Sequence, residues 1–110
     1  MTDKIVIFST CASAEEAERI ARALVEKRLA ACVSVLPRMH SVYRWKGAVE
    51  SQEEFQLVIK SNRALLDDAR MEIEKLHSYE VPEVIAVPIV DGAERYLEWI
   101  DRELVEKREP

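Results

Sequence analysis

The first apolar segment of the chain, residues 5–8, contains no polar position. A strand that is apolar on both sides of its pleat is typical of the centre of a sheet. Ser13 and Glu16 then match a capping box, in which Ser13 accepts a hydrogen bond from the Glu16 backbone and the Glu16 carboxylate reaches back. We expect a helix to begin there, with one buried stripe. This stripe consists of Ala17, Ile20, Ala21, Leu24 and Leu29.

The next two apolar segments predict a long hairpin. Residues 31–36 form an apolar run that Pro37 interrupts, and residues 42–45 continue it with large side chains at alternate positions. One bent strand is the simplest interpretation. Lys46-Gly47 supplies the turn, and apolar and polar positions alternate again through residues 54–60, the period of a third strand.

The second half of the chain predicts a helix, a strand and a last helix. Asn62 is placed to cap the second helix, which we expect to end near His77. Residues 82–90 predict a fourth strand, in which Pro88 lacks an amide donor and so indicates a sheet edge or a bulge. Gly92 ends this strand. The stripe of the third helix consists of Ala93, Tyr96, Leu97, Ile100 and Leu104.

This order of elements predicts one α+β domain over residues 1–110, a ferredoxin-like βαββαβ sandwich with a four-stranded antiparallel sheet and an additional C-terminal helix. Right-handed crossovers place both crossover helices on the same face of the sheet. The opposite face then presents Val and Ile, so we expect other copies of the chain to cover it in a closed oligomer. The alternative is a monomer in which the third helix covers that face.

The amino-acid composition argues against some classes of binding partner. Hydrophobic residues make up 48% and charged residues 34% of the 110, which is typical of a globular domain. The net charge of −5 argues against general binding to nucleic acids or acidic membranes. Residues 5–8 are too few for a signal peptide or a membrane helix, so we expect a cytoplasmic protein. Two separate cysteines, Cys11 and Cys32, predict no disulfide framework.

Few side chains are suited to bind a metal. Cys11 is expected between the first strand and the first helix, where the helix N-terminus favours a thiolate; an unreactive loop thiol is the alternative. His77 and Glu80 lie in a segment whose imidazole, phenol and carboxylates can hold a cation. The alternative is that the imidazole only interacts with the dipole at the C-terminus of the preceding helix. His40 is expected in solvent. No spacing matches a closed zinc site.

Motifs of catalysis are absent from the sequence. Gly47 and Gly92 are the only glycines, so no glycine-rich loop can cradle a phosphate, and no nucleophile elbow is present. We therefore expect a protein that is not an enzyme. Large aromatic side chains near the ends of elements are interpreted as interface anchors. They are Tyr43, Trp45, Tyr96 and Trp99.

Four segments together resemble the CutA family, the divalent-cation tolerance proteins. They are residues 26–33 (EKRLAACV), 41–47 (SVYRWKG), 77–83 (HSYEVPE) and 96–100 (YLEWI). The resemblance covers almost the whole chain. It implies a ferredoxin-like trimer of the bacterial cytoplasm, similar to PII proteins in its assembly, with a role in tolerance to copper and other divalent cations.

The resemblance also implies site residues. The family's proposed copper ligands are a cysteine near the end of the first strand and the histidine of a His-Pro-Tyr-Glu motif, which correspond here to Cys11 and His77, with Glu80 nearby. In some members the cysteine falls at the position of Ser9, and Ser78 stands here where the motif has proline. Four residues match positions that line or brace the cleft between subunits: Tyr43, Trp45, Lys60 and Trp99.

Two functions follow as hypotheses. The first is a cytosolic homotrimer of copper homeostasis that binds divalent cations weakly near an intersubunit cleft, without an organic cofactor. The alternative is a PII-like signalling module that binds a small anionic ligand in the same cleft through Lys60, Arg44 and the aromatic side chains.

Overall fold

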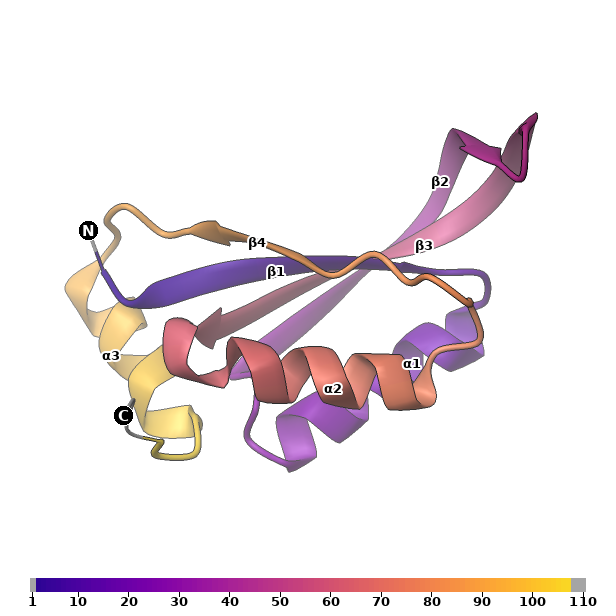
Figure 1. Cartoon of the computed structure of the whole chain (residues 1–110). Coiled ribbons are helices and arrows are strands. Elements are labelled where there is room, and N and C mark those ends of the chain that lie inside the picture. The colour runs from indigo at the N-terminus through magenta and orange to yellow at the C-terminus, as the bar shows by residue number, and fades with distance from the viewer. Residues whose placement is uncertain (1, 108–110) are drawn as a thin grey trace.

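The N-terminal apolar segment forms β1 (Lys4–Cys11), which is a central strand of the sheet, as predicted. The structure is a computed structural model and describes residues 2–107. In chain order the elements are β1, α1 (Ala14–Glu26), β2 (Cys32–Trp45), β3 (Ala48–Asn62), η1 (Arg63–Leu65), α2 (Leu66–Leu76), β4 (Ile85–Pro88) and α3 (Glu94–Glu103) (Figure 1). The strands are antiparallel in the order β2-β3-β1-β4. The predicted α+β, ferredoxin-like fold is confirmed.

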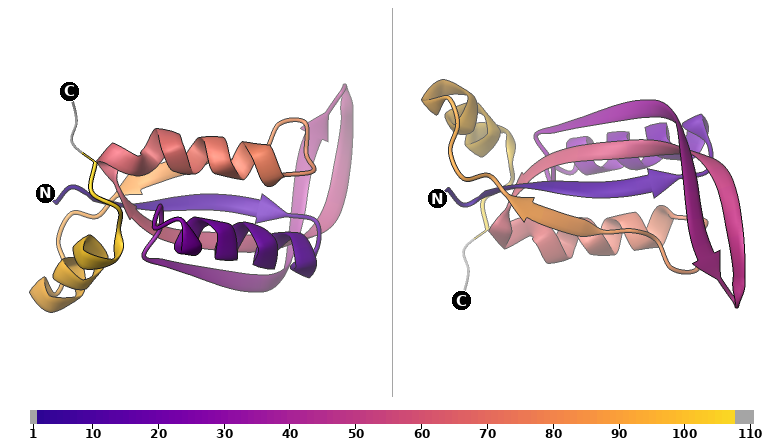
Figure 2. Two further views of the ribbon diagram at one scale, coloured as in Figure 1. Left: turned by 90° about the horizontal axis from the view of Figure 1, so that it is seen from below. Right: turned by 90° about the horizontal axis from the view of Figure 1, so that it is seen from above.

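Both crossover helices lie against the same face of the sheet, as the handedness of the connections requires (Figure 2). Side chains directly opposite each other on paired strands share a face, so Ile7 of β1 and Ile59 of β3 both point toward the helices. Ile20 and Leu24 of α1 and Ile73 of α2 pack against them, and all five side chains are fully buried. This layer is the main hydrophobic core.

The opposite face of the sheet, which we call the open face, is largely apolar. In register it carries Val6 and Phe8 of β1, with Ile85 and Val87 of β4 opposite them. Ile85 is 57% exposed and Val87 is 43% exposed. No helix lies over these strands in the view from above (Figure 2). The apolar open face predicted from the sequence is therefore present in the single chain.

The C-terminal helix does not cover the open face. Ile100 and Leu104 pack with Ala31 and Leu65 in a second, smaller core cluster. Figure 1 shows α3 at the end of the sheet where β1 begins. The alternative of a monomer whose third helix covers the whole face is wrong.

The predicted hairpin consists of β2 and β3 and extends beyond the rest of the domain (Figure 1). Lys46 and Gly47 form its turn with φ values of 50° and 83°, the positive values that a tight hairpin of this kind requires. β2 is one bent strand, as predicted, because its pairing with β3 shifts register between Leu36 and Met39. Arg38, with φ of 57°, lies within this irregularity.

Three element boundaries differ from the prediction. β4 covers four residues instead of nine; its edge position is confirmed. Leu29 packs on the core but lies after α1, which ends before Arg28 turns the chain with φ of 58°. Asn62 caps the short η1 turn that leads into α2.

Two further expectations concern the chain as a whole. Cys11 and Cys32 are both free, as predicted. Among residues 2–107, no helix is both long enough and apolar enough to span a membrane.

The helix-facing core predicts a large difference between two positions of α2. We expect Ile73→Ala to lower the free energy of unfolding by about 2–5 kcal/mol, because it removes a fully buried side chain. Met71→Ala, at a position 58% exposed on the same helix, should change it by less than about 0.5 kcal/mol. Guanidinium titration followed by circular dichroism, at equal protein concentration, measures both. Equal losses in the two variants would contradict this assignment of the core.

Candidate functional site

Cys11 is the last residue of β1 and is fully buried. Burial raises the pKa of its thiol to about 12, and the carboxylates of Glu16 and Glu54 raise it as well. The predicted loop thiolate is therefore wrong, because desolvation outweighs the favourable field of the nearby helix N-terminus. Ser9, two residues earlier on the same face, is also fully buried, and its hydroxyl has no hydrogen-bond partner among the described residues.

His77 follows α2, and its side chain is fully buried. Its Nε2 lies 2.7 Å from the carbonyl oxygen of Thr10, and the backbone N–H of Tyr79 donates to its Nδ1 at 3.0 Å. A carbonyl only accepts and an amide N–H only donates, so Nε2 carries the proton and Nδ1 is the acceptor. The imidazole thus joins the end of α2 to the end of β1 instead of capping the helix from which it comes.

Glu16 is the residue that the structure adds to the predicted metal ligands. Its backbone N–H donates to Ser13 Oγ at 3.2 Å, which confirms half of the capping box. Its carboxylate does not reach back to Ser13; Ser78 Oγ donates to Glu16 Oε1 at 3.2 Å, and that oxygen lies 3.5 Å from His77 Nδ1. Glu16 is 6% exposed, so its carboxylate is held inside the protein.

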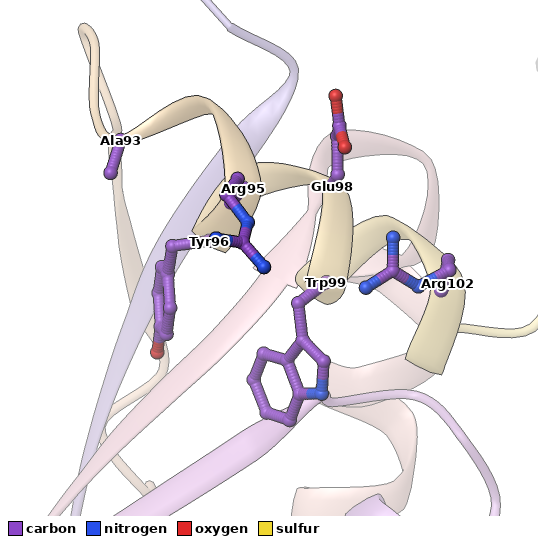
Figure 3. A pocket seen from close by; sticks show the side chains of 6 residues that line it. All are labelled: Ala93, Arg95, Tyr96, Glu98, Trp99 and Arg102. Carbon is purple, nitrogen blue, oxygen red and sulfur yellow. The ribbon is translucent and has the colours of Figure 1, made fainter.

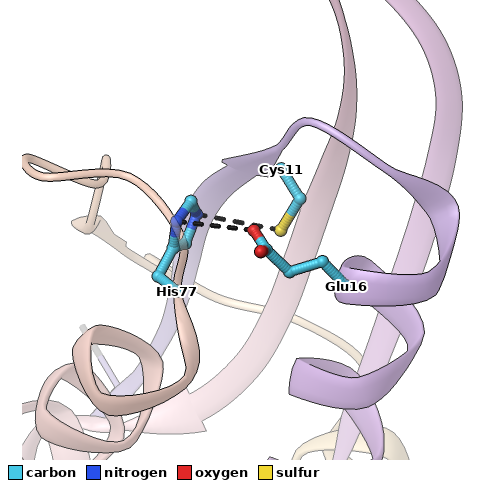
Figure 4. Close-up of side chains that lie close together, drawn as sticks. All are labelled: Cys11, Glu16 and His77. Carbon is cyan, nitrogen blue, oxygen red and sulfur yellow. Dashed lines mark hydrogen bonds and ion pairs between the residues drawn. The ribbon is translucent and has the colours of Figure 1, made fainter.

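Cys11, Glu16 and His77 form a buried cluster, which we call the Cys-Glu-His cluster (Figure 4). Their ligand atoms lie within 4.8 Å of one another, and Cys11 Sγ is 3.8 Å from His77 Nε2. One sulfur, one imidazole nitrogen and one carboxylate oxygen suit copper or zinc better than magnesium or calcium. Three protein donors leave a further coordination position for a water molecule or another ligand.

The same contacts oppose metal binding. A metal that binds His77 must replace either the Tyr79 N–H at Nδ1 or the Thr10 carbonyl at Nε2, and it must displace the proton of the Cys11 thiol. The donor set fits a soft or borderline divalent cation, but both ring nitrogens of His77 already form hydrogen bonds within the chain.

Glu80, the third predicted ligand, is not a member of the cluster in this chain. It lines a cavity of about 670 Å³ between the β2–β3 hairpin and the segment that joins α2 to β4, which we call the hairpin cavity. The aromatic side chains of Tyr43, Trp45 and Tyr79 line it, as do the carboxylates of Glu54 and Glu83.

A chain of hydrogen bonds runs along the hairpin cavity. Tyr43 Oη donates to Gln52 Oε1 at 2.9 Å, and Gln52 Nε2 donates to Tyr79 Oη at 2.9 Å. Tyr79 Oη in turn donates to Glu54 Oε2 at 2.7 Å. Burial raises the pKa of Tyr79, and this bond to Glu54 raises it as well, so Tyr79 is a stable donor. Burial also raises the pKa of Glu83, with a further contribution from the charge of Glu54.

The four predicted cleft residues form two groups within one chain. Tyr43 and Trp45 belong to the hairpin cavity. Trp99 lines a second cavity of about 550 Å³ on α3, together with Tyr96, Arg95 and Arg102 (Figure 3). Lys60 projects from β3, with its Nζ 5.9 Å from the centre of the Tyr96 ring. Because α3 and the hairpin lie at opposite ends of the domain (Figure 1), a single chain does not bring the two groups together.

Sequence reasoning missed Glu16 and Glu54 as site residues. Glu16 was assigned to the capping box, although its position in the first turn after Cys11 places it at the same edge of the sheet. Glu54 was assigned to the polar side of an alternating strand. Its burial depends on Tyr79 and the segment after α2, which no local pattern in β3 indicates.

Comparison with known proteins gives one consistent family. Residues 5–103 match the model of the family described as "CutA1 divalent ion tolerance protein". The "Divalent-cation tolerance protein CutA" of Thermus thermophilus is 42% identical over 95 residues, which is 86% of this chain and 92% of that protein. The crystal structure of CutA from Xylella fastidiosa superposes with a TM-score of 0.92 at 45% identity, covering 94% of this chain and 100% of that one.

Longer relatives match over part of their length. "Protein CutA, chloroplastic" of Arabidopsis thaliana is 42% identical over 96 residues, which is 87% of this chain but 53% of that protein. The chain thus spans about half the length of its plant relative and nearly all of the Thermus one.

The raised pKa of Glu83 predicts a pH-dependent gain in stability for Glu83→Gln. The folded state holds the Glu83 proton more tightly than the unfolded state, so this group's contribution is complete below its ordinary pKa of 4.5 and is lost as the pH rises through the folded value. We expect Glu83→Gln to raise the melting temperature relative to wild type at pH 7 but not at pH 4. Calorimetry at both pH values measures this, with exposed Glu50→Gln as the control. A gain of equal size at pH 4 would contradict it.

Proposed function

The chain belongs to the CutA1 family of divalent ion tolerance proteins, and we propose that it binds copper or a similar divalent cation through the Cys-Glu-His cluster. The observation that carries this proposal is the convergence of three unlike donors, within 4.8 Å of one another, at the end of β1. The name of the Thermus relative, a divalent-cation tolerance protein, supports the same class of ligand.

Binding at this cluster is expected to be weak and dependent on pH. The cation must displace one of the two hydrogen bonds of His77, and the free energy of that bond is subtracted from the binding free energy. Cys11 must lose a proton whose pKa burial has raised to about 12. Because binding releases this proton, the affinity of the cluster for metal should rise with pH.

We also propose that the chain works as a homotrimer. The open face carries exposed Ile85 and Val87, apolar surface that association would remove from water. The resemblance to the CutA family implies that the oligomer contains three copies of the chain. In such a trimer the hairpin of one copy and α3 of another can meet, so that Tyr43 and Trp45 join Lys60 and Trp99 in the predicted intersubunit cleft, with Glu80 near its rim.

Two other parts of the proposal concern activity and location. The Thermus relative is named as a tolerance protein, which supports metal homeostasis without catalysis. We propose the cytoplasm as the location of this chain; its Arabidopsis relative is named as chloroplastic, so the compartment differs among relatives. The alternative of a PII-like module for an anionic ligand depends on Lys60 and Arg44, and neither of them lines the hairpin cavity of the single chain.

The metal proposal predicts that one of the two histidines is essential. We expect His77→Ala to lower the affinity for Cu(II), and for Cu(I) without oxygen, by about tenfold or more, because it removes one of three donors. Exposed His40→Ala should leave affinity unchanged. Calorimetry on the full chain measures both variants. Unchanged copper affinity in His77→Ala, or in a folded Glu16→Gln variant, would remove that residue from the site.

The trimer proposal predicts that a charge on the open face prevents assembly. We expect Ile85→Arg to shift the mass measured by light scattering from trimer toward monomer, because the guanidinium would be buried without a partner. Met71→Arg is the matched control, since Met71 is 58% exposed and Ile85 57%, but Met71 lies on α2 on the opposite side of the sheet. A monomeric wild type, or an Ile85→Arg variant of unchanged mass, would contradict the proposal.

A further inference from the structure

Among residues 2–107, the hydroxyl of Ser9 is the one buried side-chain donor or acceptor without a hydrogen-bond partner. The residue is fully buried, so bulk solvent does not reach this hydroxyl. A buried hydroxyl without a partner lowers the stability of a protein, and a bound ion or water molecule is a common reason for one. Ser61 on β3, which is also fully buried, donates to the Leu29 carbonyl at 2.7 Å. This contrast singles out Ser9.

Ser9 lies on the covered face of the sheet, next to the Cys-Glu-His cluster. Alternate residues of a strand share a face, so Ser9 is on the helix side of β1 between Ile7 and Cys11. Leu57 of β3 lies opposite it in register and is fully buried. Of these three neighbours, only Cys11 has a polar side-chain atom. Residues two apart in a strand are separated by about 6–7 Å, a distance that one water molecule and one cation can span.

The coordination of a cation at the cluster requires one donor more than the cluster supplies. Its three donors are a sulfur, a nitrogen and a carboxylate oxygen, whereas zinc and copper sites commonly have four. A water molecule is the usual fourth ligand of such a site. A serine hydroxyl is not one of the common metal ligands, but it can both accept a hydrogen bond from a water molecule and donate one. The Ser9 hydroxyl uses neither capacity within the described chain.

We propose that Ser9 is a positioning residue of the metal site, whose hydroxyl hydrogen-bonds the water molecule that completes the coordination of a cation at the Cys-Glu-His cluster. This inference rests on the proposed function and adds to it a residue that does not touch the cation. Groups that hold the ligands of a metal in this way strengthen its binding. The site lies inside one chain, under the two crossover helices, so the assembly of several copies leaves it unchanged.

The first test uses the metal-free chain, in which the Ser9 hydroxyl has no partner. We expect Ser9→Ala to melt at the same temperature as wild type or higher, because the variant no longer buries an unpaired hydroxyl. Ser61→Ala is the matched control and should melt at a lower temperature, because it loses the hydrogen bond to the Leu29 carbonyl. Scanning calorimetry in the presence of a chelator measures both variants. A lower melting temperature for Ser9→Ala would overturn the inference, since the hydroxyl would then have a partner within the protein.

The second test adds metal to the same full-length variants. We expect Ser9→Ala to lower the affinity for Cu(II) by about tenfold, measured by titration calorimetry, and Ser61→Ala to keep wild-type affinity. With Co(II) as a spectroscopic probe, Ser9→Ala should also shift the visible absorption, which depends on the ligands of the ion, and Ser61→Ala should not. If Ser9→Ala binds Cu(II) as tightly as wild type, this inference alone is overturned and the metal proposal stands. A wild type that binds neither Cu(II) nor Co(II) would overturn both.

Discussion

The two hydrogen bonds of the His77 imidazole connect the parts of the molecule on which both candidate sites depend. One ring nitrogen donates to the Thr10 carbonyl at the end of β1, and the other accepts from the Tyr79 backbone. The first contact brings the ring to Cys11 and Glu16, and the second places Tyr79 where its hydroxyl reaches Glu54. The buried cluster and the acidic cavity therefore lie on either side of one side chain, and a cation that binds Nδ1 of His77 would remove the hydrogen bond that holds Tyr79.

The sheet imposes a second constraint, because right-handed crossovers leave one of its faces without helices. The covered face holds the core around Ile7, Ile59 and Ile73, while the open face keeps Ile85 and Val87 in contact with water. The long hairpin extends past the domain at one end and α3 packs at the other (Figure 1). This arrangement leaves the single chain with an element at each end and one exposed apolar surface, which supports the proposal of a homotrimer.

Regular patterns in the sequence predicted the elements that depend on local physics. Alternation in β3, the three-to-four spacing in α1 and α2, and Lys46-Gly47 at the hairpin turn all appear in the structure as expected. Features that depend on contacts with distant segments could not be predicted from such local patterns. The thiol state of Cys11 depends on burial under α1, and the site roles of Glu16 and Glu54 depend on Ser78 and Tyr79, more than 20 residues away in the chain.

The hydrogen bonds along the hairpin cavity all point in one direction. Each proton, from the Tyr43 hydroxyl to the Gln52 amide to the Tyr79 hydroxyl, lies on the side nearer to Glu54. Such a chain polarises cooperatively, so the charge on Glu54 strengthens every bond before it. Neutralising that charge loosens the outermost member, Tyr43, which is 36% exposed on the hairpin. A change of charge at Glu54 would thus weaken a hydrogen bond made by a side chain on the surface of the hairpin.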